Sequence, residues 1–209
     1  MDMQTIVRMV SDQYRVLDGY IATGGIVMIP LLIVSTVMWI LIINRMFFFH
    51  RLYRKNMNRE RAAQYISQGE IPDPREYRGV IAMLVTEFQM RRTGIIDVDR
   101  PILDETVMSV VSNLDRHLAV IGVLAKASPL LGLLGTVTGM IATFDIISVF
   151  GAGNARAMAA GISEALVTTQ TGLLVAIPGL YAYSWLTRRA ENLKRRVASV
   201  GMYLSRHLA

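Results

Sequence analysis

The run Ala127–Phe144 contains eighteen consecutive residues without a charged side chain and constrains the fold more than any other feature of the chain. As an α-helix, a run of this length crosses the ~30 Å hydrocarbon core of a bilayer. A second charge-free run extends from Gly19 to Asn44, and a third apolar run, Gly161–Leu186, contains Glu164 as its only acidic or basic residue. Because 53% of the 209 residues are also hydrophobic, the sequence predicts an all-α integral membrane protein with three transmembrane helices.

The run Ala127–Phe144 is poor in bulky side chains for a membrane helix. Small or hydroxyl-bearing residues recur in it at spacings of one, three and four: Gly132, Gly135, Thr136, Gly139 and Thr143. One side of the helix is therefore mostly backbone with a few hydroxyl groups. A closely packed neighbouring helix or a narrow polar pathway requires such a surface, whereas lipid does not. The spacing alone leaves both interpretations open.

The hydropathy and charge pattern divides the chain into seven predicted segments. They are an amphipathic outer segment (1–23), transmembrane helix 1 (24–44), a cytoplasmic helical region (45–117), transmembrane helix 2 (118–150, with its membrane part at about 127–147), a short outer link (151–160), transmembrane helix 3 (161–187) and a cytoplasmic C-terminal helix (188–209). The link is too short to form a domain. The organisation is that of one membrane protein with a single sizeable polar region.

Apolar residues at helical spacing continue beyond the second and third spans. One stripe begins at Leu103 and runs through Leu114 and Leu118 into the second span, and another runs from Leu193 to Leu208 in the C-terminal tail. Such stripes are typical of helices that bury one face. We therefore expect the second and third helices to be much longer than the bilayer and to pack together as a cytoplasmic helical bundle.

Turn and cap signals subdivide the polar region. Arg45–Gln68 is predicted to be helical and to continue the first span, and the prolines within residues 69–74 end this helix. Glu76–Arg92 is a second predicted helix. Asp99 has the character of an N-cap, because Pro101 follows in what would be the first helical turn.

The distribution of basic residues predicts the orientation. The segment 45–117 contains 12 Arg or Lys residues and the tail 188–209 contains 6, whereas residues 1–25 contain only Arg8 and Arg15. The positive-inside rule then places the N-terminus outside the cell membrane and the C-terminus in the cytoplasm. Since the basic residues lie beside the apolar runs, the net charge of +6 sets topology and does not indicate nucleic-acid binding.

The sequence has no recognisable enzyme motif. It contains neither a phosphate-binding loop nor an HExxH motif, it has no cysteine, and its three histidines lie scattered through predicted cytoplasmic segments. We therefore predict no catalytic residue, no cofactor and no metal site.

Polar residues are concentrated in the first half of the third span. Glu164, Thr168 and Thr171 share one helical stripe, and Thr169 and Gly172 lie on an adjoining small face. An ionisable group at membrane depth is costly unless it faces protein or water. Glu164 therefore either faces a polar pathway or lies shallow enough to be hydrated at the outer end of the span.

Threonines of the second and third spans can border one polar track. Thr136 and Thr143 lie on the second span and Thr168 or Thr169 on the third, and a hydroxyl group both donates and accepts hydrogen bonds. No carboxylate lies near the middle of these spans, however, so the chain lacks a group that would bind and release a proton there. If the track conducts protons, a partner must supply the acid.

Two motifs identify a resemblance to a known family. The sequences GLLGTVTGMIATF around Thr136 and GISEALVTTQTGLLVAIPGLYAY around Glu164 resemble the MotA/TolQ/ExbB proton-channel family, and GGIVMIPLLIVS at the first span resembles its ExbB branch. The resemblance covers about residues 80–190 and, less strongly, the first span. Thr138 stands where many relatives carry a bulky aromatic residue, and the region 45–117 is too short for the large insertion of flagellar MotA.

The resemblance implies an ExbB-like motor or stator subunit in the bacterial inner membrane. Such subunits form a homo-pentamer around a dimer of a single-span ExbD- or TolR-type partner, whose intramembrane aspartate carries the proton. The motor uses the proton-motive force to energise a TonB-type envelope transport protein. A TolQ-like or other motor of the same family, serving outer-membrane constriction or gliding, is one alternative. A passive membrane scaffold is an alternative of another class.

The resemblance also assigns roles to residues of the second and third spans. The implied proton-pathway residues are Thr136, Thr169 and Glu164. Independently of the resemblance, we predict that Gly132, Gly135, Gly139, Thr143, Thr168, Gly172 and Pro178 pack helices together or line a pore. Of these, the three glycines of the second span are expected at or near a central pore.

Overall fold

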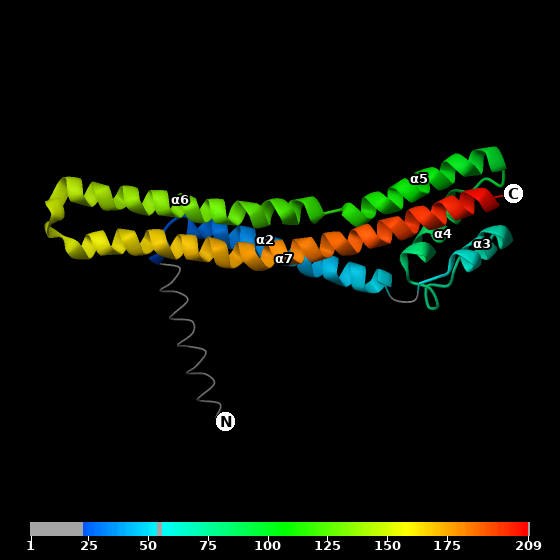
Figure 1. Cartoon of the computed structure of the whole chain (residues 1–209), viewed down its shortest axis with the longest axis horizontal. Coiled ribbons are helices and arrows are strands. Elements are labelled where there is room, and N and C mark those ends of the chain that lie inside the picture. Colours follow the sequence, from blue (N-terminus) through cyan, green and yellow to red (C-terminus); the bar gives the residue numbers. More distant parts are fainter. Residues whose placement is uncertain (1–22, 54–55, 209) are drawn as a thin grey trace, which may run out of the picture. The chain divides into compact units, whose positions relative to one another are not determined.

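The computed structural model describes residues 23–53 and 56–208, and the described residues form helices and no strand. The helices are α2 (Met28–Tyr53), α3 (Arg59–Gln68), α4 (Val80–Arg91), α5 (Ile96–Asp115), α6 (Leu118–Phe150) and α7 (Ala155–His207), with the 3₁₀ turn η1 (Gly151–Gly153) between the last two (Figure 1). In the described part of the chain, three helical stretches are long and apolar enough to cross a membrane: Met28–Tyr53, Ile96–Phe150 and Ala155–His207. This confirms the predicted fold class. The predicted amphipathic segment 1–23 lies outside the described residues except for its last residue.

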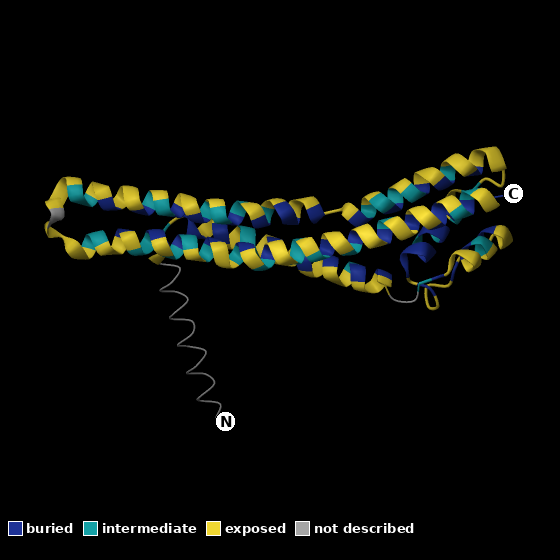
Figure 2. Cartoon of the chain, in the orientation of Figure 1, coloured by how far each residue is buried: buried dark blue, intermediate teal, exposed yellow. Residues whose placement is uncertain are grey.

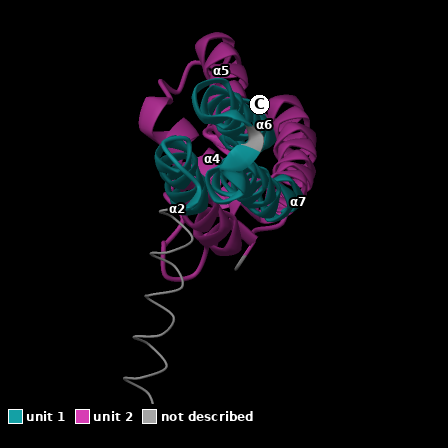
Figure 3. Ribbon diagram, turned by 90° about the vertical axis from the view of Figure 1, so that its left-hand side faces the viewer, with its two compact units in different colours: residues 1–40, 121–181 teal, residues 41–120, 182–209 magenta. Residues whose placement is uncertain are grey.

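The chain divides into two compact units (Figure 3). One consists of residues 1–40 and 121–181, and the other of residues 41–120 and 182–209. The first unit therefore contains most of the apolar spans, and the second contains the polar region together with the C-terminal part of α7.

In the first unit, α6 and α7 lie side by side and antiparallel, and α2 packs along them. Gly179 of α7 leaves space for Met38 of α2, whose side chain is fully buried. Large aliphatic side chains such as Leu130, Ile141 and Leu174 remain exposed on the outer faces of α6 and α7 (Figure 2). Aliphatic side chains that face outward along a charge-free helix match the surface that lipid requires.

The second unit has a buried core to which the end of α2, α3, α4, α5 and the C-terminal part of α7 contribute. Its largest fully buried side chains include Phe49, Phe88 and Leu103. The two apolar stripes meet as predicted: Val107 of α5 packs against Gly201 of α7, and Lys194 of α7 forms an ion pair with Asp115 of α5 over 2.6 Å.

The stripe that leads into the second span is interrupted. α5 ends at Asp115 and α6 begins at Leu118, and His117 between them has a left-handed backbone with φ 66°. The predicted single helix is therefore two helices. Arg45 stabilises the break, because its buried guanidinium donates hydrogen bonds to the carbonyl oxygens of Arg116 and, over 2.8 Å, Asn113. These carbonyls would otherwise lack a partner at the end of α5.

Two predicted helices of the polar region have different bounds. The helix that continues the first span ends at Tyr53, and α3 begins separately at Arg59, so Arg45–Gln68 is not one helix. α3 does end where predicted, at Gln68, and Gly69 follows as its C-cap with a φ of 72° that suits glycine. α4 begins at Val80 after the extended residue Gly79, four residues later than predicted.

The prediction that Asp99 is an N-cap is wrong. α5 begins at Ile96, so Asp99 lies inside its first turns. Its carboxylate, 2% exposed, instead accepts hydrogen bonds from the backbone N–H groups of Thr93 and Gly94 over 2.7 and 3.1 Å. An ion pair with Arg92 over 3.3 Å completes the arrangement. Asp99 therefore stabilises the loop before α5 by hydrogen bonding to its backbone, and it does not cap the helix.

The connection between α6 and α7 is shorter than the predicted link 151–160. α7 begins at Ala155, six residues before the predicted start of the third span, because Asn154 accepts a hydrogen bond from the backbone N–H of Ala157 over 3.2 Å and acts as an N-cap. The non-helical link is reduced to η1 and Asn154.

Candidate functional site

The small-residue side of α6 lies against α7 of the same chain. A Cβ atom on Gly172 of α7 would lie 3.0 Å from the Cα of Gly132 and 2.8 Å from the carbonyl oxygen of Ser128. A Cβ atom on Gly139 would lie 2.9 Å from the backbone nitrogen of Ala165. The two backbones therefore approach so closely that side chains are excluded, which is the packing expected of small residues in membrane helices.

Two threonines complete this contact. The Thr168 side chain occupies the space beside Gly135, and the Thr143 side chain occupies the space beside Gly161. Both side chains are buried, and each hydroxyl donates a 2.9 Å hydrogen bond to a carbonyl oxygen of its own helix. These hydroxyls are satisfied inside the helix pair. The expected place of the α6 glycines beside a central pore stays a prediction, since in one chain they face α7.

Thr169 connects the two helices. Its hydroxyl donates a hydrogen bond to the carbonyl oxygen of Gly132 across the helix pair, over 3.1 Å. The side chain is only partly buried. Close approach of the backbones at Gly132 and Gly172 makes this bond possible, because threonine is too short to reach a carbonyl on a normally spaced neighbouring helix.

Thr136 lies on the same side of the helix pair as Thr169. Gly135 and Thr168 contact each other, and one further residue turns each helix by about 100°. In an antiparallel pair these two turns point to the same side, so Thr136 and Thr169 flank the contact together. The Thr136 hydroxyl donates to the carbonyl oxygen of Leu133 over 2.6 Å. Among the hydrogen bonds that the structure describes, none joins Thr136 directly to Thr169.

Glu164 of α7 lies beside the chain segment that leads into the first transmembrane helix, α2. Its carboxylate occupies the space beside Gly25, where a Cβ atom would clash with it. Gly25 also has a positive φ of 64°, so glycine is required there on two grounds. The Glu164 side chain is half-buried, and Thr169 lies five residues further along α7, about 7.5 Å at the usual rise. This position near one end of the spans accords with both interpretations of Glu164.

Several residues of this arrangement escaped sequence reasoning. Ser128, Gly161 and Gly179 make close contacts between helices, and Gly25, which precedes α2, makes a close contact with α7. The role of Gly161 in helix packing could have been predicted, because it continues the small-residue spacing of the third span. The sequence indicates only a turn at Gly25. Pro178, predicted to pack or to line a pore, is partly buried and precedes Gly179.

Groups of three or more His, Cys, Asp or Glu residues that could hold a metal ion do not occur among the described residues. The groups that the described residues place at the contact between α6 and α7 are hydroxyls and backbone carbonyls, with the Glu164 carboxylate near its end.

Comparison with known proteins identifies the family. The family model described as "MotA/TolQ/ExbB proton channel family" matches residues 78–199, which include α6, most of α7 and the whole helix contact. The chain belongs to this family. Its members are proton-channel and transport subunits and not a known class of enzyme.

Individual relatives agree with this assignment. An ExbB-like biopolymer transport protein of Synechocystis sp. is 29% identical over 199 residues, covering 91% of this chain and 78% of the relative. The biopolymer transport protein ExbB of Salmonella typhimurium is 27% identical over 83% of this chain and 77% of the relative. The Tol-Pal system protein TolQ of Haemophilus influenzae is 33% identical over 41% of this chain and 37% of the relative. This chain is thus a multi-pass membrane protein of the ExbB/TolQ type.

Proposed function

We propose that this chain is an ExbB-like stator subunit of the bacterial inner membrane that, with an ExbD-type single-span partner, uses the proton-motive force to energise a TonB-type envelope transport protein. One observation carries the proposal: Thr136 and Thr169 flank the same side of a helix pair held together by glycine contacts. Hydroxyl groups on a tightly packed pair offer hydrogen-bonding partners for water or an acid without introducing charge.

The proposed assembly is a homo-pentamer around a dimer of the partner, with the N-terminus of each subunit in the periplasm. The middle parts of the spans lack a carboxylate, so this chain lines the proposed pathway without titrating there. The partner's intramembrane aspartate supplies the group that is protonated and deprotonated. Glu164, beside Gly25, lies at the periplasmic end of the proposed pathway. A proton that crosses 100 mV releases ~2.3 kcal/mol, so several protons are needed for substantial work.

The test replaces the two threonines by valine, which keeps the shape and removes the hydroxyl. Thr136→Val and Thr169→Val should each abolish energy coupling to envelope transport, while the complex with the partner still assembles. Thr138→Val is the matched control, because Thr138 lies on the same helix, bonds to the carbonyl of Gly135 over 3.1 Å and points about 200° away from Thr136. The control should couple fully.

Proton flux in liposomes gives the second readout. The chain alone should conduct few protons, and the partner should raise conduction only when its aspartate is intact. Full coupling in the double variant Thr136→Val, Thr169→Val would leave these threonines with a packing role and would favour the passive scaffold.

A TolQ-like motor is the second candidate. The local similarity to TolQ of Haemophilus influenzae supports it. Affinity purification of the chain from its own membranes separates the two candidates, since a TonB-type protein and a Tol-type protein should not both be recovered at comparable yield.

A further inference from the structure

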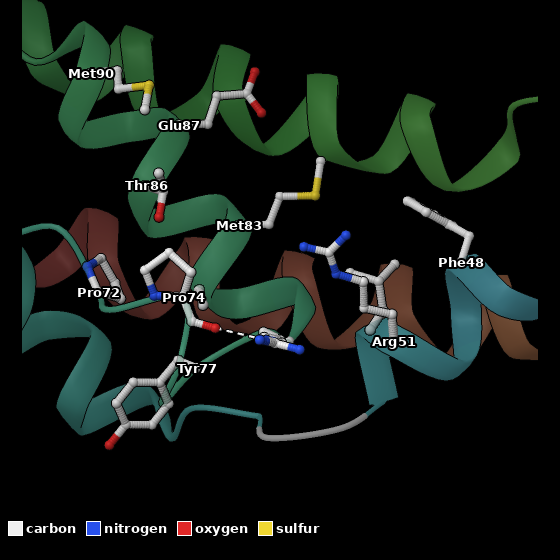
Figure 4. Close-up of a pocket in the computed structure, with 13 residues that line it drawn as sticks. Phe48, Arg51, Pro72, Pro74, Tyr77, Met83, Thr86, Glu87 and Met90 are labelled. Atoms are coloured by element: carbon white, nitrogen blue, oxygen red, sulfur yellow. Dashed lines mark hydrogen bonds between the residues drawn. The ribbon is translucent and has the colours of Figure 1, made fainter.

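An apolar groove lies on the second unit and has no role in the proposed proton pathway. It has a volume of about 440 Å³ and lies between the end of α2, residues 72–79 and α4 (Figure 4). Its lining is mainly apolar, with Phe48 and Leu52 from α2, Pro72 from the loop, and Met83 and Met90 from α4. This size falls within the range of about 300–1,000 Å³ that is usual for small-ligand sites.

Positive charge borders the groove. Arg51 and Arg78 both line it, and Figure 4 shows Arg51 near Phe48, which lies on the same helix, α2. Arg78 donates from Nε to the carbonyl oxygen of Pro74 over 2.8 Å, drawn as a dashed line in Figure 4, which fixes the position of the guanidinium. In the hydrogen bonds that the structure describes, its other two nitrogens are unused.

The one acidic residue of the lining is already neutralised. Glu87 forms an ion pair with Arg91 over 3.1 Å and accepts a hydrogen bond from the Ser109 hydroxyl over 2.9 Å. The groove therefore combines an apolar floor with two cationic groups, and its charge complements an anion that carries an apolar chain.

The groove begins close to the membrane. The charge-free run of the first span ends at Asn44, and Phe48 and Arg51 follow on the same helix, four and seven residues further on. At the usual helical rise these residues lie about 6 and 10 Å beyond the end of the span. The headgroup layer is about 5–7 Å thick, so Phe48 lies at its level, and the long Arg51 side chain reaches back to it. This depth follows from α2 alone and does not depend on the proton pathway.

We propose that this groove binds an anionic phospholipid, with one acyl chain along Leu52, Met83 and Met90 and the headgroup phosphate contacting Arg51 and Arg78. Arginine is well suited to phosphate, because its planar guanidinium donates two parallel hydrogen bonds. An acidic peptide would match the charge, but the mostly apolar floor and the short distance from the bilayer favour a lipid.

The test uses the full chain in nanodiscs of phosphatidylcholine that contain a photoactivatable phosphatidylglycerol, with the reactive group at the end of an acyl chain. Mass spectrometry then maps the crosslinked residues. We expect crosslinks within residues 82–90, and far fewer when the same probe carries a phosphatidylcholine headgroup. Arg51→Gln and Arg78→Gln should each weaken labelling about fivefold, the usual effect of one basic residue near an anionic membrane surface.

Two controls make the result decisive. Arg188→Gln removes an exposed basic residue at the end of the third span, outside the groove, and should leave labelling unchanged. Thr86→Trp fills the groove while keeping both arginines, and should abolish labelling of residues 82–90. Crosslinks confined to the spans, equal labelling by the phosphatidylcholine probe, or equal labelling by a photoactivatable free fatty acid would each overturn the proposal.

Discussion

Replacing Gly172 by alanine tests whether the backbone contact between α6 and α7 determines the stability of this helix pair. The new Cβ atom would lie 2.8 Å from the carbonyl oxygen of Ser128, whereas ordinary contacts begin at about 3.4 Å, so the helices must separate by about 0.6 Å. Backbone atoms cannot rotate away as a side chain can. Overpacking of this kind costs about 2 kcal/mol.

Helix propensity opposes the effect of overpacking, so whether Gly172→Ala raises or lowers stability shows which of the two dominates. Alanine favours a helix over glycine by about 1 kcal/mol, so propensity alone predicts that Gly172→Ala stabilises the protein. If the backbone contact dominates, the net result is a loss of about 1 kcal/mol, or a melting temperature lower by about 3 °C for a chain of this size. The Thr169–Gly132 hydrogen bond, already 3.1 Å long, should lengthen as well.

The assay is thermal unfolding in detergent, followed by circular dichroism. Gly153→Ala is the matched control, because Gly153 lies in η1, has no positive φ and would place its Cβ in open space. It should leave the melting temperature unchanged. A melting temperature that rises in Gly172→Ala would refute the reasoning, since it would show that the helices separate without cost.

Three other predictions concern the second unit and the topology. Asp99→Asn should cost about 2 kcal/mol, because an amide cannot accept from all the donors that hold the carboxylate. Burial raises the pKa of Asp99, but the hydrogen bonds from Thr93 and Gly94 and the charge of Arg92 outweigh it, so the folded pKa is lowered. The resulting stability should be present above a pH of about 3.9 and decline as the pH falls toward the folded pKa, an acid-dependent loss that thermal unfolding of the Asn variant would lack. Arg45→Gln should destabilise the second unit by about 1–3 kcal/mol in denaturant titration, because it leaves carbonyl groups at the end of α5 unpaired. In intact cells, an impermeant thiol reagent should label Gly153→Cys and leave Glu60→Cys and Arg195→Cys unlabelled; labelling at position 60 would reverse the proposed orientation.

The spans and the long apolar stripes were predictable because hydropathy and helical periodicity are local properties of the sequence. The break between α5 and α6 was not. Leu114 and Leu118 remain four residues apart and both remain buried, so the stripe has the same spacing with or without the break. What ends the helix is the left-handed backbone at His117 and the side chain of Arg45, which is distant in sequence.

The cap signal at Asp99 failed for a related reason. An Asp shortly before a proline is typical of a helix start, and the sequence around Asp99 fits that pattern. The structure uses the carboxylate to bind backbone N–H groups at Thr93 and Gly94, in a loop whose path no local spacing specifies. In the candidate site, the small-residue faces were recognisable, but the pairing of Gly25 with Glu164 depends on how the first span lies against the third. Tertiary contacts of this kind are not encoded in the spacing of either segment.

The hydrogen bonds of the two flanking threonines restrict what they can do in the proposed pathway. A hydroxyl has one proton to donate, and both donate it to backbone carbonyls, at Leu133 and Gly132. Each therefore presents only acceptor lone pairs to its surroundings. Acceptors favour a protonated carboxylic acid or a water molecule over a carboxylate, so in the proposed complex they stabilise the partner's aspartate in its protonated form. Serine retains this acceptor and valine does not, so Thr136→Ser and Thr169→Ser should keep most of the coupling that the valine variants lose. Equal loss of coupling in the serine and valine variants would show that the methyl group, and hence packing, is what matters at these positions.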